Sequence, residues 1–361
     1  MTDTGDPYAP QIWSNLHARV HQTLRSRQLL PARSAVMVAV SGGQDSLCLL
    51  RLLLDLQSKW RWRLTAAHCD HRWPSDDGIF DFVAQQAARW QVPLVSASAV
   101  APPTGESGAR QWRYHTLTAM ACAQNCTALV TGHTASDRAE TLLFNLIRGS
   151  GLTGLKGLIW QRPLRVEDTR ELNSGAEISL VRPLLNITRQ TTEEFCQSRD
   201  IPVWQDVTNR DRRFARPRLR HELLPYLRQQ FNPQVETTLN QTAELLATEE
   251  DYLTQAAQHL YNRAVAQVDG WRLHRPTLIA AHPALRRRVV RLALIQQMPS
   301  HPRFDQIEKV TDLLHSPNRS QSDPLPGGAI ALVEGDWIVF KMHSTPPHSS
   351  LWKESQPKRH D

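Results

Sequence analysis

The sequence contains few lysines, few cysteines and no long apolar run. Its five cysteines are a sparse, odd number in 361 residues, which favours free thiols in a reducing cytoplasm over a disulfide framework. No apolar run approaches the ~18–20 residues that a membrane-spanning helix needs. The N-terminal residues have no basic start followed by an apolar stretch, so no signal peptide is predicted. These absences argue against membrane and secreted proteins and predict a cytoplasmic one.

The first feature of the composition that points to a function is its charge. Lysine and arginine together number 42, and aspartate and glutamate 35, which gives a net charge of +7. Only six of those 42 basic residues are lysines. An excess of arginine favours a polyanionic partner. With 40% hydrophobic residues, the composition allows real cores and excludes an acidic disordered protein, a collagen-like chain and a coiled coil.

Short apolar runs alternate with amphipathic segments along the first half of the chain. Strands are predicted at 34–40, 63–71, 92–100, 127–133 and 177–185, and most of the segments between them have helical spacing. Strands that alternate with helices predict an α/β fold with a doubly wound, mostly parallel sheet.

The pattern changes near residue 210, where the sequence becomes polar and basic. We predict a catalytic domain over 1–210 and a second, mainly helical domain over 211–342 that ends in a hairpin turning at 334–336. The tail 343–361 contains Pro, Ser and Lys and is expected to be disordered. The apolar faces of the C-terminal helices can pack internally or between subunits, so a homodimer is an open alternative.

A glycine turn joins the first predicted strand to an apolar helix, where a parallel sheet places its ligand. It reads Ser41-Gly42-Gly43-Gln44-Asp45-Ser46. Its backbone N–H groups, serine hydroxyls and helix N-terminus suit a phosphate. Asp45 would repel that phosphate unless Mg²⁺ lay between them. Neither a Walker-type motif nor a GxGxxG fingerprint is present; a tight turn with a satisfied helix cap is the alternative.

This string resembles the pyrophosphatase loop of the N-type ATP pyrophosphatases, which split ATP between the α and β phosphates and adenylate a substrate oxygen. Four further segments indicate which enzymes of this superfamily the chain resembles: residues 68–72, 108–114, 131–141 and 182–185. In order and spacing they resemble the tRNA(Ile)-lysidine synthases, closely over 34–230 and loosely over 280–340.

That resemblance implies an adenine nucleotide alpha hydrolase-like fold and an ATP-dependent ligase. Its reaction attaches free lysine to C2 of the wobble cytidine in an isoleucine tRNA with a CAU anticodon. An adenylated cytidine is the intermediate, and AMP and pyrophosphate are released.

The resemblance also assigns site residues. ATP is expected on Ser41, Gly42, Gly43, Gln44, Asp45, Ser46 and His68, with Asp45 facing Mg²⁺. Catalytic roles fall to Asp45, Arg113 and His133, and substrate binding to Asp137, Glu140 and Arg110. Asp137 and Glu140 are three apart on a predicted helical turn, so they face the same way and are assigned to lysine.

Each assignment has a structural alternative. Asp137 and Glu140 also fit a pair that caps the helix and complements its dipole. For Arg113 the alternative is a surface salt bridge, and for each histidine a hydrogen-bonded structural role.

Four positions depart from the family pattern. Thr134 stands where a second His is common, Ser136 where an Asp is common, Arg138 where Gln is common and Pro217 where Asn is frequent. The site therefore has one carboxylate fewer. We expect Arg138 to point outward, because an inward-facing cation would repel lysine.

Two arginine-rich segments are candidate tRNA contacts. Residues 210–220 hold six arginines against one aspartate, and 286–288 hold three arginines in succession. Neutralising phosphates supplies most non-specific nucleic-acid affinity, whereas a solvated basic face is the alternative. The predicted contacts are Arg210, Arg212, Arg213, Arg216, Arg218, Arg220, Arg286 and Arg287.

Two other functions compete with the synthase. A tRNA thiolase of the same superfamily usually carries catalytic CxxC cysteines or a cluster-binding set, and neither is present. A non-catalytic RNA-binding protein on a decayed ATPase scaffold is the other, and the intact loop argues against decay.

Overall fold

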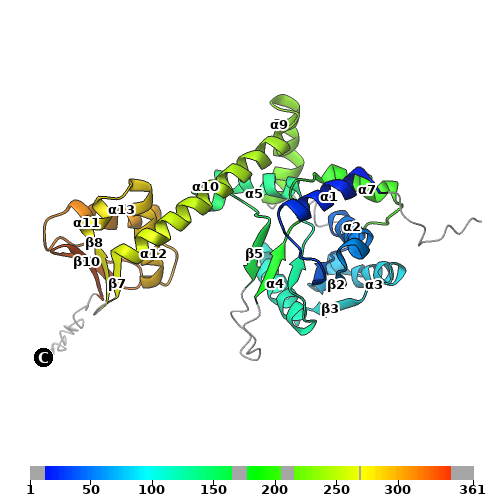
Figure 1. Ribbon diagram of the computed structural model, residues 1–361, viewed down its shortest axis with the longest axis horizontal. Helices are drawn as coiled ribbons and strands as arrows, with labels where there is room; N and C mark the ends of the chain where they lie inside the picture. The colour runs from blue at the N-terminus through cyan, green and yellow to red at the C-terminus, as the bar shows by residue number, and fades with distance from the viewer. Residues whose placement is uncertain (1–12, 165–176, 205–214, 268–269, 343–361) are drawn as a thin grey trace, which may run out of the picture. The chain divides into compact units, whose positions relative to one another are not determined.

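The computed structural model describes residues 13–164, 177–204, 215–267 and 270–342 (Figure 1). The chain forms two compact units, Met1–Ala247 and Thr248–Asp361. The tail 343–361, which was expected to be disordered, lies outside the described residues.

The first unit is built on a six-stranded sheet with strand order β3-β2-β1-β4-β6-β5. The strands are β1 (Ala35–Ala39), β2 (Arg63–Asp70), β3 (Leu94–Ser98), β4 (Ala128–Val130), β5 (Gln161–Leu164) and β6 (Ile178–Val181). β1, β2, β3, β4 and β6 pair in parallel, and β5 pairs antiparallel with β6. The predicted fold class and all five predicted strands are confirmed; β5 was not predicted.

Helices cover both faces of this sheet. They are α1 (Asn15–Ser26), α2 (Gln44–Trp60), α3 (Ile79–Arg89), α4 (Gly105–Ala123), α5 (Ala135–Ile147), α6 (Leu152–Leu155) and α7 (Arg189–Ser198). Alternate residues of β1 enter two cores: Val36 and Val38 pack with α1, α2 and α3, whereas Ala35 and Met37 pack with α4. A strand buried on both faces explains why 34–40 is almost continuously apolar.

The first unit extends further along the chain than the predicted boundary at residue 210. Beyond the sheet it includes α8 (Ala215–Arg218), a π-helical turn (Leu219–Leu223), α9 (Leu224–Gln230) and the start of α10 (Val235–Ala264). Leu219 and Leu224 are buried in one cluster with Ala139 and Leu143 of α5. This apolar packing joins residues 215–247 to the catalytic sheet.

The second unit combines helices with a small antiparallel sheet of order β7-β8-β10-β9. Its elements after α10 are β7 (Val265–Gln267), β8 (Trp271–His274), α11 (Arg275–Ile279), α12 (Pro283–Gln297), α13 (Phe304–Asp312), β9 (Ala329–Glu334) and β10 (Trp337–Met342). The predicted hairpin is β9–β10, which pairs from Trp337–Glu334 to Met342–Ala329. β7 and β8 are short and were not predicted.

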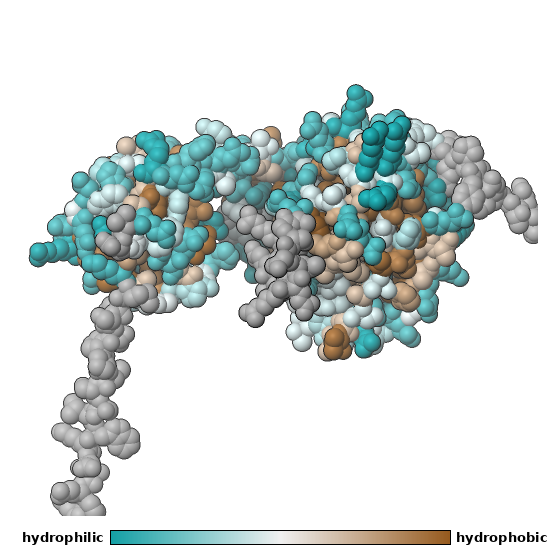
Figure 2. Space-filling model, turned by 60° about the horizontal axis from the view of Figure 1, so that its bottom comes forward, coloured by the Kyte–Doolittle hydropathy of each residue, from teal (hydrophilic) through white to brown (hydrophobic). Residues whose placement is uncertain are grey.

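The sequence contains no apolar run long enough to predict a membrane-spanning helix. Among the described residues, no helix is both long enough and apolar enough to span a bilayer. Figure 2 shows hydrophilic residues over much of the drawn face, with apolar residues between them.

Candidate active site

The glycine turn lies between β1 and α2, as predicted. Gly42 has a φ of +82°, and a Cβ there would lie 3.3 Å from Cβ of Trp204. The Ser46 hydroxyl donates to the carbonyl of Gly43 (2.9 Å) and accepts from the backbone N–H of Ser41 (3.1 Å). Glycine is therefore required at the bend, and the loop is closed by its own last serine.

A cavity of about 500 Å³ opens on this loop, a size common for small-ligand sites. It brings together eight of the predicted residues: Ser41, Gly43, Gln44, Asp45, Ser46, Arg113, His133 and Asp137. Residues that were not predicted there line it as well, among them Tyr114, Arg189, Trp204 and Arg220. Gly42, His68, Arg110 and Glu140 do not line it.

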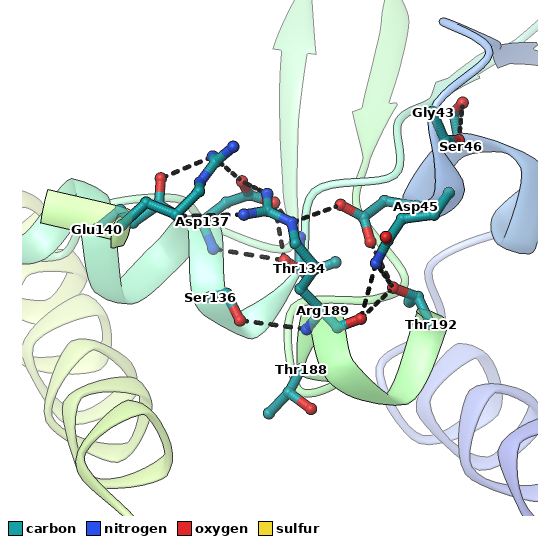
Figure 3. Close-up of polar contacts among 12 residues, drawn as sticks. Gly43, Asp45, Ser46, Thr134, Ser136, Asp137, Glu140, Thr188, Arg189 and Thr192 are labelled. Carbon is teal, nitrogen blue, oxygen red and sulfur yellow. Dashed lines mark hydrogen bonds and ion pairs between the residues drawn. The ribbon is translucent and has the colours of Figure 1, made fainter. Parts of the chain in front are cut away.

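Arg189, the first residue of α7, joins the loop to the start of α5 (Figure 3). Its Nη2 lies 2.7 Å from Oδ1 of Asp137, and its Nη1 lies 3.3 Å from Oε1 of Glu140. Its Nε lies 3.1 Å from Oδ2 of Asp45, whose other oxygen accepts from Thr192. One guanidinium group thus contacts all three carboxylates assigned to the site.

Arg220 contacts the same carboxylates from a different segment. Its Nε lies 2.7 Å and its Nη2 2.9 Å from the two oxygens of Glu140, and its Nη2 lies 3.5 Å from Asp137. The structure therefore places Arg220 in the carboxylate cluster, where its guanidinium is engaged, and its predicted contact with tRNA stays a prediction.

Asp137 serves the site and the helix cap at once. Its Oδ2 accepts from the backbone N–H and the hydroxyl of Thr134, both at 2.8 Å, which completes a capping box at the start of α5. Burial alone would raise the pKa of Asp137, but Arg189, His133 and these hydrogen bonds outweigh it and lower the pKa to about 2. The helix-capping alternative for Asp137 is therefore realised in a side chain that also lines the cavity, and its assignment to lysine stays a prediction.

Two of the histidines at strand ends differ in their surroundings. His133 lines the cavity, and its Nδ1 lies 2.8 Å from the Thr131 hydroxyl. Burial, opposed by Asp137 and reinforced by nearby arginines, lowers the pKa of His133 to about 3. His68 is 2% exposed, and its Nδ1 lies 2.8 Å from the carbonyl of Val40. The structure gives His68 the hydrogen-bonded structural role and does not place it in the cavity.

The departures from the family pattern have structural partners. Ser136 donates to Glu236 at 2.6 Å. Arg138 is 2% exposed and pairs with Glu244 of α10 at 2.8 Å. Arg138 was expected to point outward; it does not line the cavity, but it is buried and pairs with the half-buried Glu244 instead of facing solvent. Pro217 lies in the short helix α8.

The basic segments are partly engaged within their own units. Arg216 pairs with Glu106 at 3.0 Å, and Arg218 lies 3.9 Å from Glu222. Arg287 pairs with Glu308 at 2.7 Å, and Arg286 donates to two backbone carbonyls. Arg210, Arg212 and Arg213 lie outside the described residues. The tRNA role of these arginines stays a prediction.

The sequence around the residues that were not predicted gives little indication that they belong to the site. Arg189 opens a helix directly after Thr188, its cap, but its carboxylate partners are 49 to 144 positions away in the sequence. Trp204 precedes a polar stretch and gave no sign of lying against Gly42. Such contacts follow from the sheet order, which brings the ends of β1, β4 and β6 together.

The loop, the sheet and the cavity define a class that comparison with known proteins confirms. A model of the PP-loop domain matches residues 14–227. The chain is an enzyme of the ATP-binding PP-loop class.

More specific matches follow from the rest of the chain. A model of the TilS substrate binding domain matches residues 273–335. The tRNA(Ile)-lysidine synthase of Nostoc sp. is 49% identical over 344 residues, which cover 91% of this chain and 98% of that protein. That of Synechocystis sp. is 47% identical over 331 residues, with 91% and 98% covered. This chain belongs to the tRNA(Ile)-lysidine synthase family, and the resemblance seen in the sequence is confirmed.

A solved structure shares the fold at lower similarity. The U34-tRNA thiolase of Methanococcus maripaludis with its [4Fe-4S] cluster aligns with a TM-score of 0.52 and 17% identity, covering 64% of this chain and 77% of that chain. The likeness shows the common sheet architecture alone. The five cysteines of the present chain are all free thiols, as predicted.

Proposed function

We propose that this chain attaches free L-lysine to C2 of the wobble cytidine of an isoleucine tRNA with a CAU anticodon. ATP adenylates the C2 oxygen with release of pyrophosphate, and the lysine ε-nitrogen then displaces AMP. The observation that carries the proposal is one cavity that contains both the PP-loop and Asp137. Nucleotide activation and amine binding are thereby brought to adjacent sites.

The loop fits the triphosphate and a magnesium ion carried with it. Burial raises the pKa of Asp45, although Arg189 and Thr192 favour its charged form. Among the described residues, no group of three or more His, Cys, Asp or Glu side chains is placed to hold a metal ion. A single carboxylate that acts together with phosphate oxygens is a common Mg²⁺ environment. Asp45 would hold Mg²⁺ in that way, and the ion would neutralise phosphate charge.

The acidic pair fits the lysine substrate. Asp137 and Glu140 are both buried or nearly so and already bind cationic groups, those of Arg189 and Arg220. In the proposed complex a lysine ammonium takes over part of these contacts. Because a carboxylate with a pKa of about 2 accepts protons weakly, Asp137 orients the amine rather than deprotonating it.

The low pKa of His133 indicates that this residue acts in its uncharged form. With a pKa of about 3, its imidazole is uncharged at neutral pH and can donate or accept a hydrogen bond. Arg113, which lines the cavity, remains the candidate for stabilising charge on the transferring adenylyl group. A cytoplasmic location is predicted from the sequence, which leaves a homodimer as an open alternative.

The test is the dependence of AMP release on each substrate. We expect AMP and pyrophosphate to form from ATP only with unmodified isoleucine tRNA, and AMP release to require lysine as well. Arginine and ornithine serve as matched amines. AMP release at the same rate with and without lysine, or AMP release that requires a sulfur donor, would contradict the proposal.

A further inference from the structure

Tyr114, on α4, stands at the centre of an arginine cluster that the proposed reaction leaves partly unused. The guanidinium carbon of Arg110 lies 5.0 Å from its ring centroid, that of Arg162 5.4 Å and that of Arg113 5.8 Å. Arg110 and Arg113 belong to α4, whereas Arg162 belongs to the edge strand β5. Three cations from two elements therefore surround one aromatic ring.

A fourth cation, Arg182, follows β6 and is 2% exposed. Its Nη1 donates to the carbonyl of Ile159 at 2.7 Å. Its Nε is buried and has no hydrogen-bond partner among the described residues. An unpaired buried polar atom on a charged group is costly, which adds to the cost of keeping Arg182 buried among the other arginines.

Among the described residues, no carboxylate pairs with the arginines of this cluster. Within the part of the chain that the structure describes, Arg110, Arg113, Arg162 and Arg182 form no ion pair. Burial lowers the pKa of Arg182; Tyr114 opposes this shift, and Arg162 and Arg110 add to it. Burial also lowers the pKa of Arg113, again against the effect of Tyr114. Gathering four cations without a counter-charge is unfavourable, and a bound anion would reverse that balance.

The chemistry and position of the cluster select a phosphate. Guanidinium groups donate in pairs to phosphate oxygens. Arg113 and Tyr114 line the cavity, whereas Arg110 and Arg162 do not and are half-buried. The cluster thus runs from the cavity wall to residues beyond it. A polynucleotide matches that extent, because one nucleotide can enter the cavity while its neighbouring phosphate stays outside.

We propose that Arg110, Arg113 and Arg162, with Tyr114, bind a phosphodiester of the tRNA backbone beside the target cytidine, and that the buried Arg182 adds positive charge behind them. This inference rests on the proposed function and adds a positioning site to it. The cation–π contacts hold the guanidinium groups in place before tRNA arrives. The ATP triphosphate is the other source of the same chemistry, and the experiment separates the two.

The test uses Arg162→Gln, because this side chain is half-buried at a sheet edge and makes no ion pair with a described residue. Binding of an unmodified isoleucine tRNA transcript is measured at several salt concentrations, and ATP binding is measured separately. We expect weaker tRNA binding, with the slope of log affinity against log salt reduced by about one, and unchanged ATP binding. Arg162→Lys should restore part of the slope.

Arg89→Gln is the matched control, since Arg89 is an exposed arginine at the end of α3, and it should leave the slope unchanged. Weaker ATP binding with unchanged tRNA binding would assign the cluster to the triphosphate and overturn the proposal. An unchanged slope in Arg162→Gln would overturn it as well. Failure of the wild type to transfer lysine would contradict the proposed reaction alone, because the salt slopes are measured by binding.

Discussion

Asp137 shows how much one side chain does in this site. It caps α5 through Thr134, pairs with Arg189 and lines the cavity. The sequence located Asp137 because its motif is local. The arginines that hold it were beyond reach, because Arg189 and Arg220 are 52 and 83 positions away. The local motif predicted the carboxylates of this cluster, whereas its arginines could be identified only from the folded structure.

Replacing Asp137 tests its assignment to lysine. Asp137→Asn removes a charge-assisted contact worth roughly 1.5–3 kcal/mol. We therefore expect the KM for lysine to rise about ten- to a hundredfold, with the KM for ATP nearly unchanged, in steady-state assays of AMP release. Glu194→Gln, at an exposed carboxylate of α7, is the control. Unaltered lysine saturation in Asp137→Asn would remove this residue from the lysine site.

The pKa of Asp137 also predicts how stability depends on pH. Its folded-state pKa of about 2 lies below the ordinary value of 3.8. The unfolded chain therefore binds more protons between these values, so this contribution is complete above about pH 4 and is lost as the pH falls towards 2. Urea unfolding between pH 2.5 and 5 should show a weaker pH dependence in Asp137→Asn than in the wild type. Equal pH dependence would show that Asp137 has an ordinary pKa.

At the scale of elements, the site depends on the close approach of β4 to α2. A Cβ on Gly132 would lie 2.8 Å from the backbone carbonyl carbon and oxygen of Asp45. Backbone atoms cannot move aside as a flexible side chain can, so the end of β4 must carry glycine. The sequence predicted both elements from their apolar patterns. It missed β5, which is four residues long and contains Pro163, a residue that sheets accept at an edge.

A substitution at Gly132 tests this approach. Gly132→Ala should lower the free energy of unfolding by about 1–3 kcal/mol, the usual cost of overpacking, and should weaken ATP binding because the loop is displaced. Gly151→Ala is the matched control, since a Cβ there meets no atom within 4 Å. Calorimetric ATP binding and chemical denaturation measure the two effects. Wild-type ATP affinity in Gly132→Ala would contradict the proposed coupling.

The start of α5 gives a second test at this scale. Thr134 is fully buried, and its hydroxyl accepts from the backbone N–H of Asp137. Thr134→Ala should cost about 1 kcal/mol through loss of the cap, whereas Thr134→Ser, which keeps the hydroxyl, should cost less. Denaturation of both variants measures the difference. An equal loss in the two would assign the effect to the methyl group instead of the cap.

At the scale of the whole molecule, the described residues that line the cavity all belong to the first compact unit. Sequence patterns placed the end of this unit too early, at residue 210. There the alternation of strands and helices stops, but apolar side chains of 219–224 still pack on α5. The boundary between the two units leaves little trace in the sequence, because it falls inside α10, a single helix of 30 residues. Fold class was therefore predictable from pattern, whereas domain extent depended on tertiary packing.

The most direct test of the account is the fate of lysine and of the cytidine oxygen in one reaction. The protein is incubated with ATP, labelled lysine and isoleucine tRNA whose wobble cytidine carries ¹⁸O at C2. Mass spectrometry of the digested tRNA should find lysine joined to that cytidine, and the released AMP should contain the ¹⁸O. Lysine absent from the tRNA, or ¹⁸O retained in the nucleoside, would contradict the account.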